Sequence, residues 1–157
     1  MQIIKVTYTN EDIIDYDSFD NISDFNLVFE INCASNKLTS LPDNMNFPNL
    51  QVFDCNYNQL TLLHDNMNFP NLRYFNCCAN KLTALPDNMN FPNLQKFNCH
   101  NNQLTSLPLY ILNWKNIRHI SCYNNPIKLS PQIEEFIKKN NIYINTFGFH
   151  GVPSHQV

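Results

Sequence analysis

Glycine is almost absent from this chain of 157 residues. Its two glycines, Gly148 and Gly151, both lie within the last ten residues. The phosphate-binding loops of nucleotide-dependent enzymes need closely spaced glycines, because their backbone must approach the phosphate groups. The part of the chain before Gly148 therefore holds no P-loop and no dinucleotide-binding motif, which excludes both of these enzyme classes.

Basic runs and long apolar runs are also missing. The chain contains 10 Lys and Arg and 13 Asp and Glu, which gives a formal net charge of −3. Its longest basic run is Lys138 and Lys139. Nucleic-acid binding by counterion release has no visible basis here. No apolar run reaches the roughly eighteen residues of a membrane span, and no secretory signal opens the chain. We expect an intracellular, cytoplasmic protein that is not secreted and that binds neither nucleic acid nor a membrane.

Cysteine and asparagine, in contrast, are abundant. After glycine, asparagine best tolerates a left-handed backbone, so we expect asparagines to make most of the turns. Five of the six cysteines recur at an almost constant interval, with successive gaps of 22, 22, 22 and 23, and Cys78 stands outside this series. Such a constant interval indicates repeated structural units rather than a disulfide framework. The five periodic cysteines are Cys33, Cys55, Cys77, Cys99 and Cys122.

Around these cysteines one string, LxxLxLxxNxL, occurs five times in phase. The copies are VFEINCASNKL, LQVFDCNYNQL, LRYFNCCANKL, LQKFNCHNNQL and IRHISCYNNPI, which begin at Val28, Leu50, Leu72, Leu94 and Ile117. Between the first four copies DNMNFPN recurs three times. The pattern resembles the leucine-rich repeat, and five copies in register make this resemblance specific.

The spacing predicts the architecture. Apolar residues at alternate positions of LxL indicate a short strand with one face toward a core, and a strand that recurs at this interval must stack on its neighbours. We therefore predict an α/β-type solenoid with a curved parallel sheet of about five 22–23-residue repeats. One or two prolines in each repeat exclude a long helix there, so the convex side should be mostly extended or in turns.

The repeats are predicted to span residues 28–129 and to be closed at both ends. Residues 1–27 break the phase and should form an N-terminal cap with a strand or hairpin arm. Ser130 and Pro131 begin a pattern typical of a capping helix, followed by an edge strand, in residues 130–146. Residues 147–157 are predicted to be a frayed tail.

Two columns of identical residues are predicted to have structural roles. The asparagines Asn36, Asn58, Asn80, Asn102 and Asn125 should hydrogen-bond to the backbone where the chain turns inward after each strand. The five periodic cysteines should be reduced core residues, because the chain has no CxxC pair at zinc spacing. Cys78 should point outward as an exposed thiol. We expect no metal and no cofactor.

No HExxH, GxSxG or Ser/His/Asp arrangement accompanies the histidines, so we predict no catalytic residues. The concave face of the solenoid remains as a candidate binding surface, since aromatic rings with polar ends suit a rigid interface. Its predicted partner-binding residues are Tyr57, Tyr74, Lys96, His100, His119 and Tyr123. Five strands would make a strip far smaller than a standard protein interface.

The resemblance implies a non-enzymatic module that binds a protein partner on the concave face, and we expect a monomer. The near-copied LTSLP repeats look like those of bacterial effectors. With an asparagine-rich, glycine-poor composition they are still more similar to leucine-rich repeat proteins of giant amoeba-infecting DNA viruses, of the mimivirus kind, which implies a host cytoplasm. Two alternatives stay open. One is an accessory or substrate-recognition subunit of a ubiquitin ligase or phosphatase. The other is a structural or virion component that self-associates through an uncapped edge.

Overall fold

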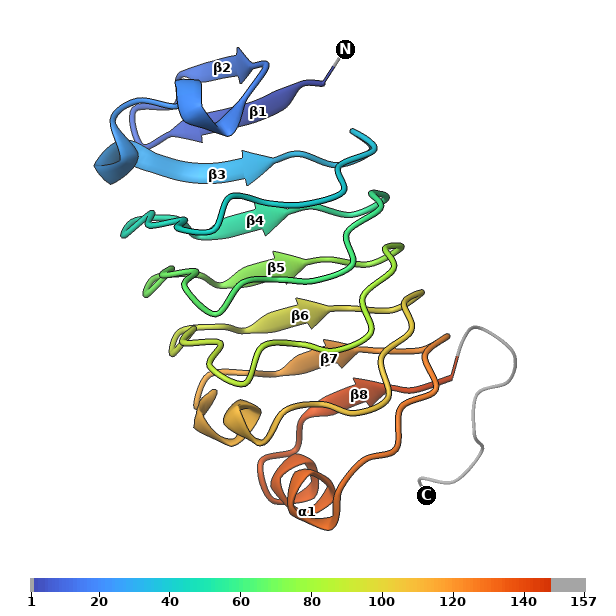
Figure 1. Cartoon of the computed structure of the whole chain (residues 1–157). Helices are drawn as coiled ribbons and strands as arrows, with labels where there is room; N and C mark the ends of the chain where they lie inside the picture. The colour runs from blue at the N-terminus through green and yellow to red at the C-terminus, as the bar shows by residue number, and fades with distance from the viewer. Residues whose placement is uncertain (1, 148–157) are drawn as a thin grey trace.

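The computed structural model describes residues 2–147, so the predicted tail at 147–157 lies outside the described residues except for Phe147. Eight strands form one sheet in the order β2-β1-β3-β4-β5-β6-β7-β8 (Figure 1). β3 to β8 run parallel, whereas β1 is antiparallel to both β2 and β3. The strands are β1 Ile4–Tyr8, β2 Ile13–Tyr16, β3 Val28–Asn32, β4 Val52–Asp54, β5 Tyr74–Asn76, β6 Lys96–Asn98, β7 His119–Ser121 and β8 Tyr143–Asn145.

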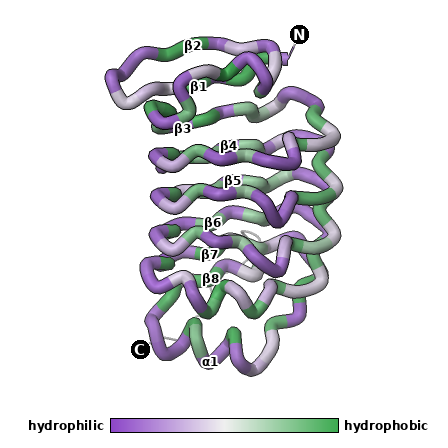
Figure 2. The backbone as a smooth tube through the Cα atoms, turned by 60° about the vertical axis from the view of Figure 1, so that its left-hand side comes forward, coloured by the Kyte–Doolittle hydropathy of each residue, from purple (hydrophilic) through white to green (hydrophobic). Residues whose placement is uncertain are grey.

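Each of the five repeats contributes one strand, and the constant spacing keeps the strands in register. Phe53 lies opposite Ile31 on one side and opposite Phe75 on the other. Figure 2 shows the coils stacked one above another, with hydrophobic and hydrophilic positions recurring from coil to coil. The predicted α/β-type solenoid with a parallel sheet and a C-terminal helix is confirmed.

Two columns of aromatic rings fill the core between the sheet and the return segments. Phe53, Phe75 and Phe97 come from the strands, and Phe53 stacks on Phe75 with ring centroids 5.5 Å apart. Phe69 and Phe91 come from the DNMNFPN segments and stack at 5.6 Å. Rings of the two columns meet edge to face, an arrangement that aromatic pairs favour. The aromatic residue of each return segment therefore closes the core behind the strand.

The convex side is built from turns, as the prolines predict. One isolated bridge, between Asn46 and Asn68, joins neighbouring return segments. In the fourth repeat the longer LYILN segment forms the 3₁₀ helix η3, Leu109–Asn113. It is followed by the buried Trp114, whose ring meets Phe97 edge to face at 5.4 Å. Tryptophan thus takes the core position that phenylalanine fills in the earlier repeats.

The turn that follows each strand differs from the sequence prediction. The second residue after each periodic cysteine has a left-handed backbone, with φ between 49° and 57°. These residues are Ser35, Tyr57, Ala79, Asn101 and Asn124, so only two of the five are asparagines. The expectation that asparagine supplies most left-handed turns is wrong here. The conformation is held by neighbours, because in four repeats the N–H of this residue donates to a carbonyl of the next repeat at 3.0–3.1 Å.

The two ends of the solenoid are closed differently. The β1–β2 hairpin adds two strands at the N-terminal end, and the 3₁₀ helices η1, Phe19–Asn21, and η2, Phe25–Leu27, lead into β3. At the other end the helix α1, Pro131–Lys139, begins after Ser130, whose Oγ accepts a hydrogen bond from the Ile133 N–H. Among residues 2–147 no helix is both long and apolar enough to cross a bilayer.

Candidate functional site: the outer face of the sheet

The outer sheet face comprises the strand side chains that point away from the core and the residue after each periodic cysteine. Strand pairing arranges its side chains in straight columns. One column is Thr7, Glu30, Val52, Tyr74, Lys96, His119 and Tyr143. A second is Lys5, Asn32, Asp54, Asn76, Asn98, Ser121 and Asn145. The third positions are Ala34, Asn56, Cys78, His100 and Tyr123.

The structure places five of the six predicted partner-binding residues in three ring contacts on this face. The Lys96 Nζ lies 5.5 Å from the centre of the Tyr74 ring. The His100 and Tyr123 rings stack with centroids 4.3 Å apart. His119 stacks not on another predicted residue but on Tyr143, at 4.9 Å. These contacts restrict the orientation of the rings in the single chain.

Tyr57 and Tyr143 lie at the margins of this face. Tyr57 sits on the left-handed turn after β4 and is 64% exposed, so it stands at the rim and not on the sheet. Tyr143 is 60% exposed and was not among the predicted surface residues. Its strand lies outside the LxxLxLxxNxL phase, and only its place about one repeat length after His119 could have pointed to it.

A hydrogen-bonded network fills the middle of the outer sheet face. The Asp54 carboxylate accepts from the Asn76 Nδ2 at 3.2 Å and from the Asn56 N–H at 3.0 Å. The Tyr74 hydroxyl accepts from the Asn98 Nδ2 at 3.1 Å. Partial burial raises the pKa of Asp54, and the two hydrogen bonds oppose that shift. The network spans three adjacent strands and fixes these side chains.

The environment of the two histidines on this face lowers the pKa of each. Desolvation lowers the pKa of His100, and desolvation together with the nearby Lys96 lowers the pKa of His119. Both shifts favour the uncharged imidazole, and the face presents amides and aromatic rings rather than a field of one sign.

The Ser121 Oγ lies 3.4 Å from the His100 Nδ1, a contact that sequence reasoning did not foresee. Ser121 is buried, and within residues 2–147 His100 has no carboxylate partner that could orient it as a base. A nucleophile, its base and an orienting acid are all needed for the usual serine hydrolysis. The contact is therefore a packing feature of two neighbouring strands.

The burial of Cys78 contradicts the prediction of an exposed thiol at this position. Cys78 points to the outer side as expected, but its exposed fraction is only 4%, so the predicted exposed thiol is wrong. It lies in the crowded centre of the sheet, and its N–H donates to the Asn76 Oδ1 at 3.3 Å. Burial raises the pKa of the Cys78 thiol to about 11. The thiol packs beneath the outer sheet face and is poorly reactive.

The five periodic cysteines form a buried inner column. All are free thiols, and burial raises the pKa of each. For Cys33, Cys55 and Cys77 the Sγ lies 3.5 Å from a backbone carbonyl of the next repeat. Among the described residues no three His, Cys, Asp or Glu side chains gather as a metal site would need.

The asparagine column makes the backbone contacts that its position suggests. The Asn58 Nδ2 donates to the Cys33 and Cys55 carbonyls at 2.9 and 3.0 Å, and its Oδ1 accepts from the Leu38 N–H at 2.9 Å. Asn80, Asn102 and Asn125 repeat this pattern. Asn36, the first of the column, instead exchanges hydrogen bonds with Ile3 ahead of β1.

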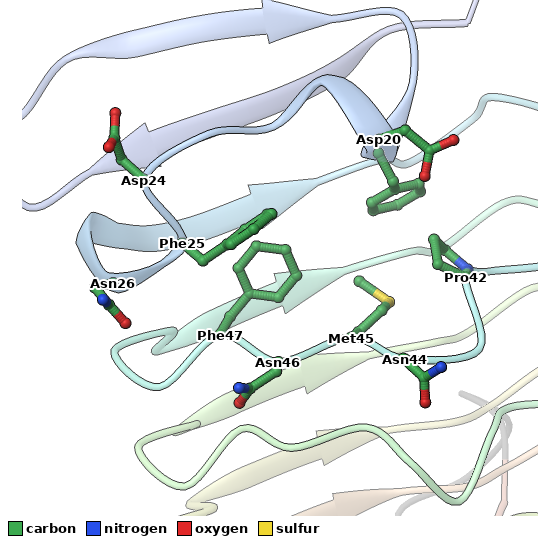
Figure 3. Close-up of a pocket in the computed structure, with 10 residues that line it drawn as sticks. Asp20, Asp24, Phe25, Asn26, Pro42, Asn44, Met45, Asn46 and Phe47 are labelled. Atoms are coloured by element: carbon green, nitrogen blue, oxygen red, sulfur yellow. The ribbon is translucent and has the colours of Figure 1, made fainter.

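A separate groove of about 650 Å³ lies between the N-terminal cap and the first return segment. Figure 3 shows Phe25 and Phe47 in its middle and Met45 beside them, with Asp24 and Asp20 on opposite sides. Phe25 is 49% exposed, and its ring meets that of Phe47 edge to face at 5.4 Å. The groove is a second surface with an apolar floor, separate from the outer sheet face.

Comparison with known proteins identifies the architecture. A family model of leucine-rich repeats, in two copies, matches residues 92–135. A leucine-rich repeat protein of Leptospira interrogans shares 28% identity, with a TM-score of 0.60, over 74% of this chain and 36% of its own length. InlP of Listeria monocytogenes shares 32% identity, with a TM-score of 0.57, over 69% of this chain and 30% of its own. The chain has the leucine-rich repeat fold.

The outer sheet face is therefore the concave face of a leucine-rich repeat solenoid. This chain spans about a third of the length of each of the two solved structures. A search of curated proteins finds no match. Both solved structures come from bacteria, so the resemblance to proteins of giant amoeba-infecting viruses stays a prediction from the sequence.

Proposed function

We propose that this protein is a non-enzymatic interaction module that binds a protein partner on its outer sheet face. Leucine-rich repeat domains generally mediate protein–protein interaction and are typically not enzymes. The observation that carries the proposal is the set of pre-ordered rings, Lys96 over Tyr74, His100 on Tyr123 and His119 on Tyr143. Rings already fixed in the free protein lose little conformational entropy on binding.

The chemistry of the face indicates the kind of partner. With an Asp54–Asn76 pair, a Tyr74–Asn98 pair and charges of both signs, the face offers hydrogen bonds and aromatic area rather than a field of one sign. A partner that inserts apolar and amide side chains suits it better than a highly charged one.

The size of the face limits how the partner binds. Because the hairpin and β8 join the sheet, eight strands at about 4.8 Å give a strip roughly 34 Å long, longer than five repeats alone would give. At a width of roughly 12 Å it still falls short of the roughly 800 Å² per partner of a standard interface. The partner must also contact the rim, where Tyr57 stands.

The experiment is an affinity capture with three baits, analysed by quantitative mass spectrometry. The wild-type chain is compared with a Tyr57→Ala/Lys96→Ala/Tyr123→Ala variant of the outer sheet face and with an Asp20→Asn/Asp24→Asn variant of the groove. We expect the first variant to lose the partner and the second to retain it. Retention by the first variant, or loss by the second alone, would contradict the proposed surface. A ubiquitin ligase or phosphatase recovered in stoichiometric amount would specify an accessory-subunit role.

We also propose that the protein works in a reducing compartment, which fits an intracellular location. All six cysteines are free and buried, and thiols stay reduced in the cytosol. Fractionation of the source cells with an antibody against the chain tests this, and recovery from the extracellular medium would contradict it.

A further inference from the structure

In the part of the chain that the structure describes, the outermost strands of the sheet, β2 and β8, each have one edge without a partner strand. Within the described residues β2 pairs only with β1, and β8 pairs only with β7. The Tyr143 N–H donates to the Arg118 carbonyl and the Asn145 carbonyl accepts from the Cys122 N–H, both at 2.9 Å. Ile144, between them, must turn its own N–H and C=O toward the other edge, because these groups alternate along a strand. An open edge of this kind is a template for another strand.

The direction of the two edge strands is compatible with a continuous sheet. β2 is antiparallel to β1, and β1 is antiparallel to β3, so β2 runs parallel to β3 and to every later strand, including β8. Figures 1 and 2 place β2 and β8 at opposite ends of the stack. A second copy shifted along the stack would bring its β2 beside β8 of the first as a parallel pair.

The registers then bring matching side chains together. Following the columns through all eight strands, Ile13 ends the column of Tyr143, Ile14 ends that of Ile144, and Asp15 ends that of Asn145. Two pairs would be apolar, and Ile13, Ile14 and Tyr143 are 62%, 44% and 60% exposed in the single chain. The third would place an amide beside a carboxylate, as Asn76 and Asp54 already do in the same column.

The charges of the two ends are opposite. Residues 1–27 contain six carboxylates and one lysine, namely Glu11, Asp12, Asp15, Asp17, Asp20, Asp24 and Lys5. Residues 108–147 contain five cations and two carboxylates, namely Lys115, Arg118, Lys128, Lys138, Lys139, Glu134 and Glu135. Contact of the two different ends joins opposite charges, whereas contact of two like ends joins charges of one sign. The helix α1 lies at the same end as β8 and carries Lys138 and Lys139 in its last turn (Figure 1).

We propose that this chain associates head to tail with a second copy of itself, β8 of one copy pairing in parallel with β2 of the next. The register places Tyr143 beside Ile13, Ile144 beside Ile14 and Asn145 beside Asp15. Such a heterologous contact does not close on itself, so it builds open-ended arrays in which the outer sheet face is lengthened copy by copy. The sequence-based expectation of a monomer then holds only for the dilute protein. This inference does not depend on the proposed binding of another protein.

The test uses two surface variants that block one end each. Ile13→Asp puts a carboxylate opposite Tyr143, and Tyr143→Asp puts one opposite Ile13 and toward the acidic cap. Both positions are largely exposed, so the fold of either variant should be retained, which circular dichroism checks. The readout is the weight-average mass by sedimentation velocity and multi-angle light scattering, over a range of protein and salt concentrations.

We expect the wild-type mass to rise above twice the chain mass with concentration and to fall when salt is raised, since the two ends attract by charge. Each variant alone should remain monomeric. An equal mixture of the two should reach twice the chain mass and stop there, because only one intact pair of ends remains and the two blocked ends repel. Three results would each overturn the proposal: a wild-type chain that stays monomeric at every concentration, a variant that still forms arrays, or a mixture that stays monomeric. If one variant alone forms a closed dimer, the contact joins like ends and the head-to-tail arrangement is wrong.

Discussion

Asn80 shows how a single side chain completes a turn. Its Nδ2 donates to the carbonyls of Cys55, Cys77 and Cys78 at 3.1, 3.1 and 3.2 Å, and its Oδ1 accepts from the Leu60 N–H at 3.0 Å. All four partners belong to its own repeat or to the one before it, at the point where the chain leaves the strand. The amide therefore satisfies backbone groups that the sheet ladder cannot reach.

Replacing Asn80 by Ala should leave several buried backbone groups without partners. Each unpaired buried group costs about 1–3 kcal/mol, so we expect the free energy of unfolding to fall by about that much or more. Urea unfolding followed by Trp114 fluorescence measures the loss. The control is Asn88→Ala, at an exposed site of a return segment, which should change the stability by less than about 0.5 kcal/mol. Equal stabilities of the two variants would refute the role of Asn80.

The rate at which the Cys78 thiol reacts should depend on pH. A thiol pKa of about 11 instead of the ordinary 9.0 lowers the thiolate fraction at pH 8 by roughly a hundredfold. At pH 8 the native chain should therefore react with a thiol reagent at least about a hundredfold more slowly than a free thiol does. The reaction rate should rise about tenfold per pH unit between pH 8 and 10. All six cysteines should react at once in denaturant. Native labelling at the rate of a free thiol would contradict the burial of Cys78.

At the scale of elements, the C-terminal helix is short and depends on its ends. α1 has nine residues, and only Ile133 among them is fully buried. Ser130 caps its first turn, Pro131 stands at the first helical position, and Lys138 and Lys139 lie in the last turn, where cations interact favourably with the helix dipole. Isolated helices of this length are marginal in water, so capping and packing decide whether it forms.

Ser130→Ala should accordingly destabilise the C-terminal end by about 1 kcal/mol, because it removes the acceptor for the Ile133 N–H. Ser130→Asp should retain the stability, because aspartate caps a helix equally well. Chemical denaturation of the three proteins gives the comparison. If Ser130→Ala and Ser130→Asp lose the same amount, the effect does not come from the cap.

At the scale of the whole molecule, stability is distributed along one dimension. Within residues 2–147 each strand pairs only with its neighbours in the order of the sheet, so a central strand is supported from both sides and an end strand from one. The hydrophobic core is nevertheless continuous from Ile4 to Ile142. The ends should therefore open more often than the middle.

Hydrogen exchange in dilute protein should show this gradient. We expect the amides of β5 to be protected most strongly and those of β2 and β8 to exchange fastest among the strands. Mass spectrometry of peptides after timed deuteration measures the order. Uniform protection along the sheet would indicate that the solenoid opens as a single unit. Slower exchange in β2 and β8 at high protein concentration, absent from the Ile13→Asp variant, would further support the head-to-tail contact.

Much of this molecule follows from the sequence by itself. The constant repeat period, the LxL alternation and the prolines are local properties of the chain, and they determine one short strand per repeat, its inward face and its helix-poor return. The burial of Cys78, the left-handed backbone at Tyr57 and Ala79, and the stacking of His119 on Tyr143 were decided only by the tertiary structure. Each depends on the size and position of side chains in neighbouring coils, which no single repeat encodes. The common register of β2 and β8 is of the same kind, because it arises from pairings carried across all eight strands.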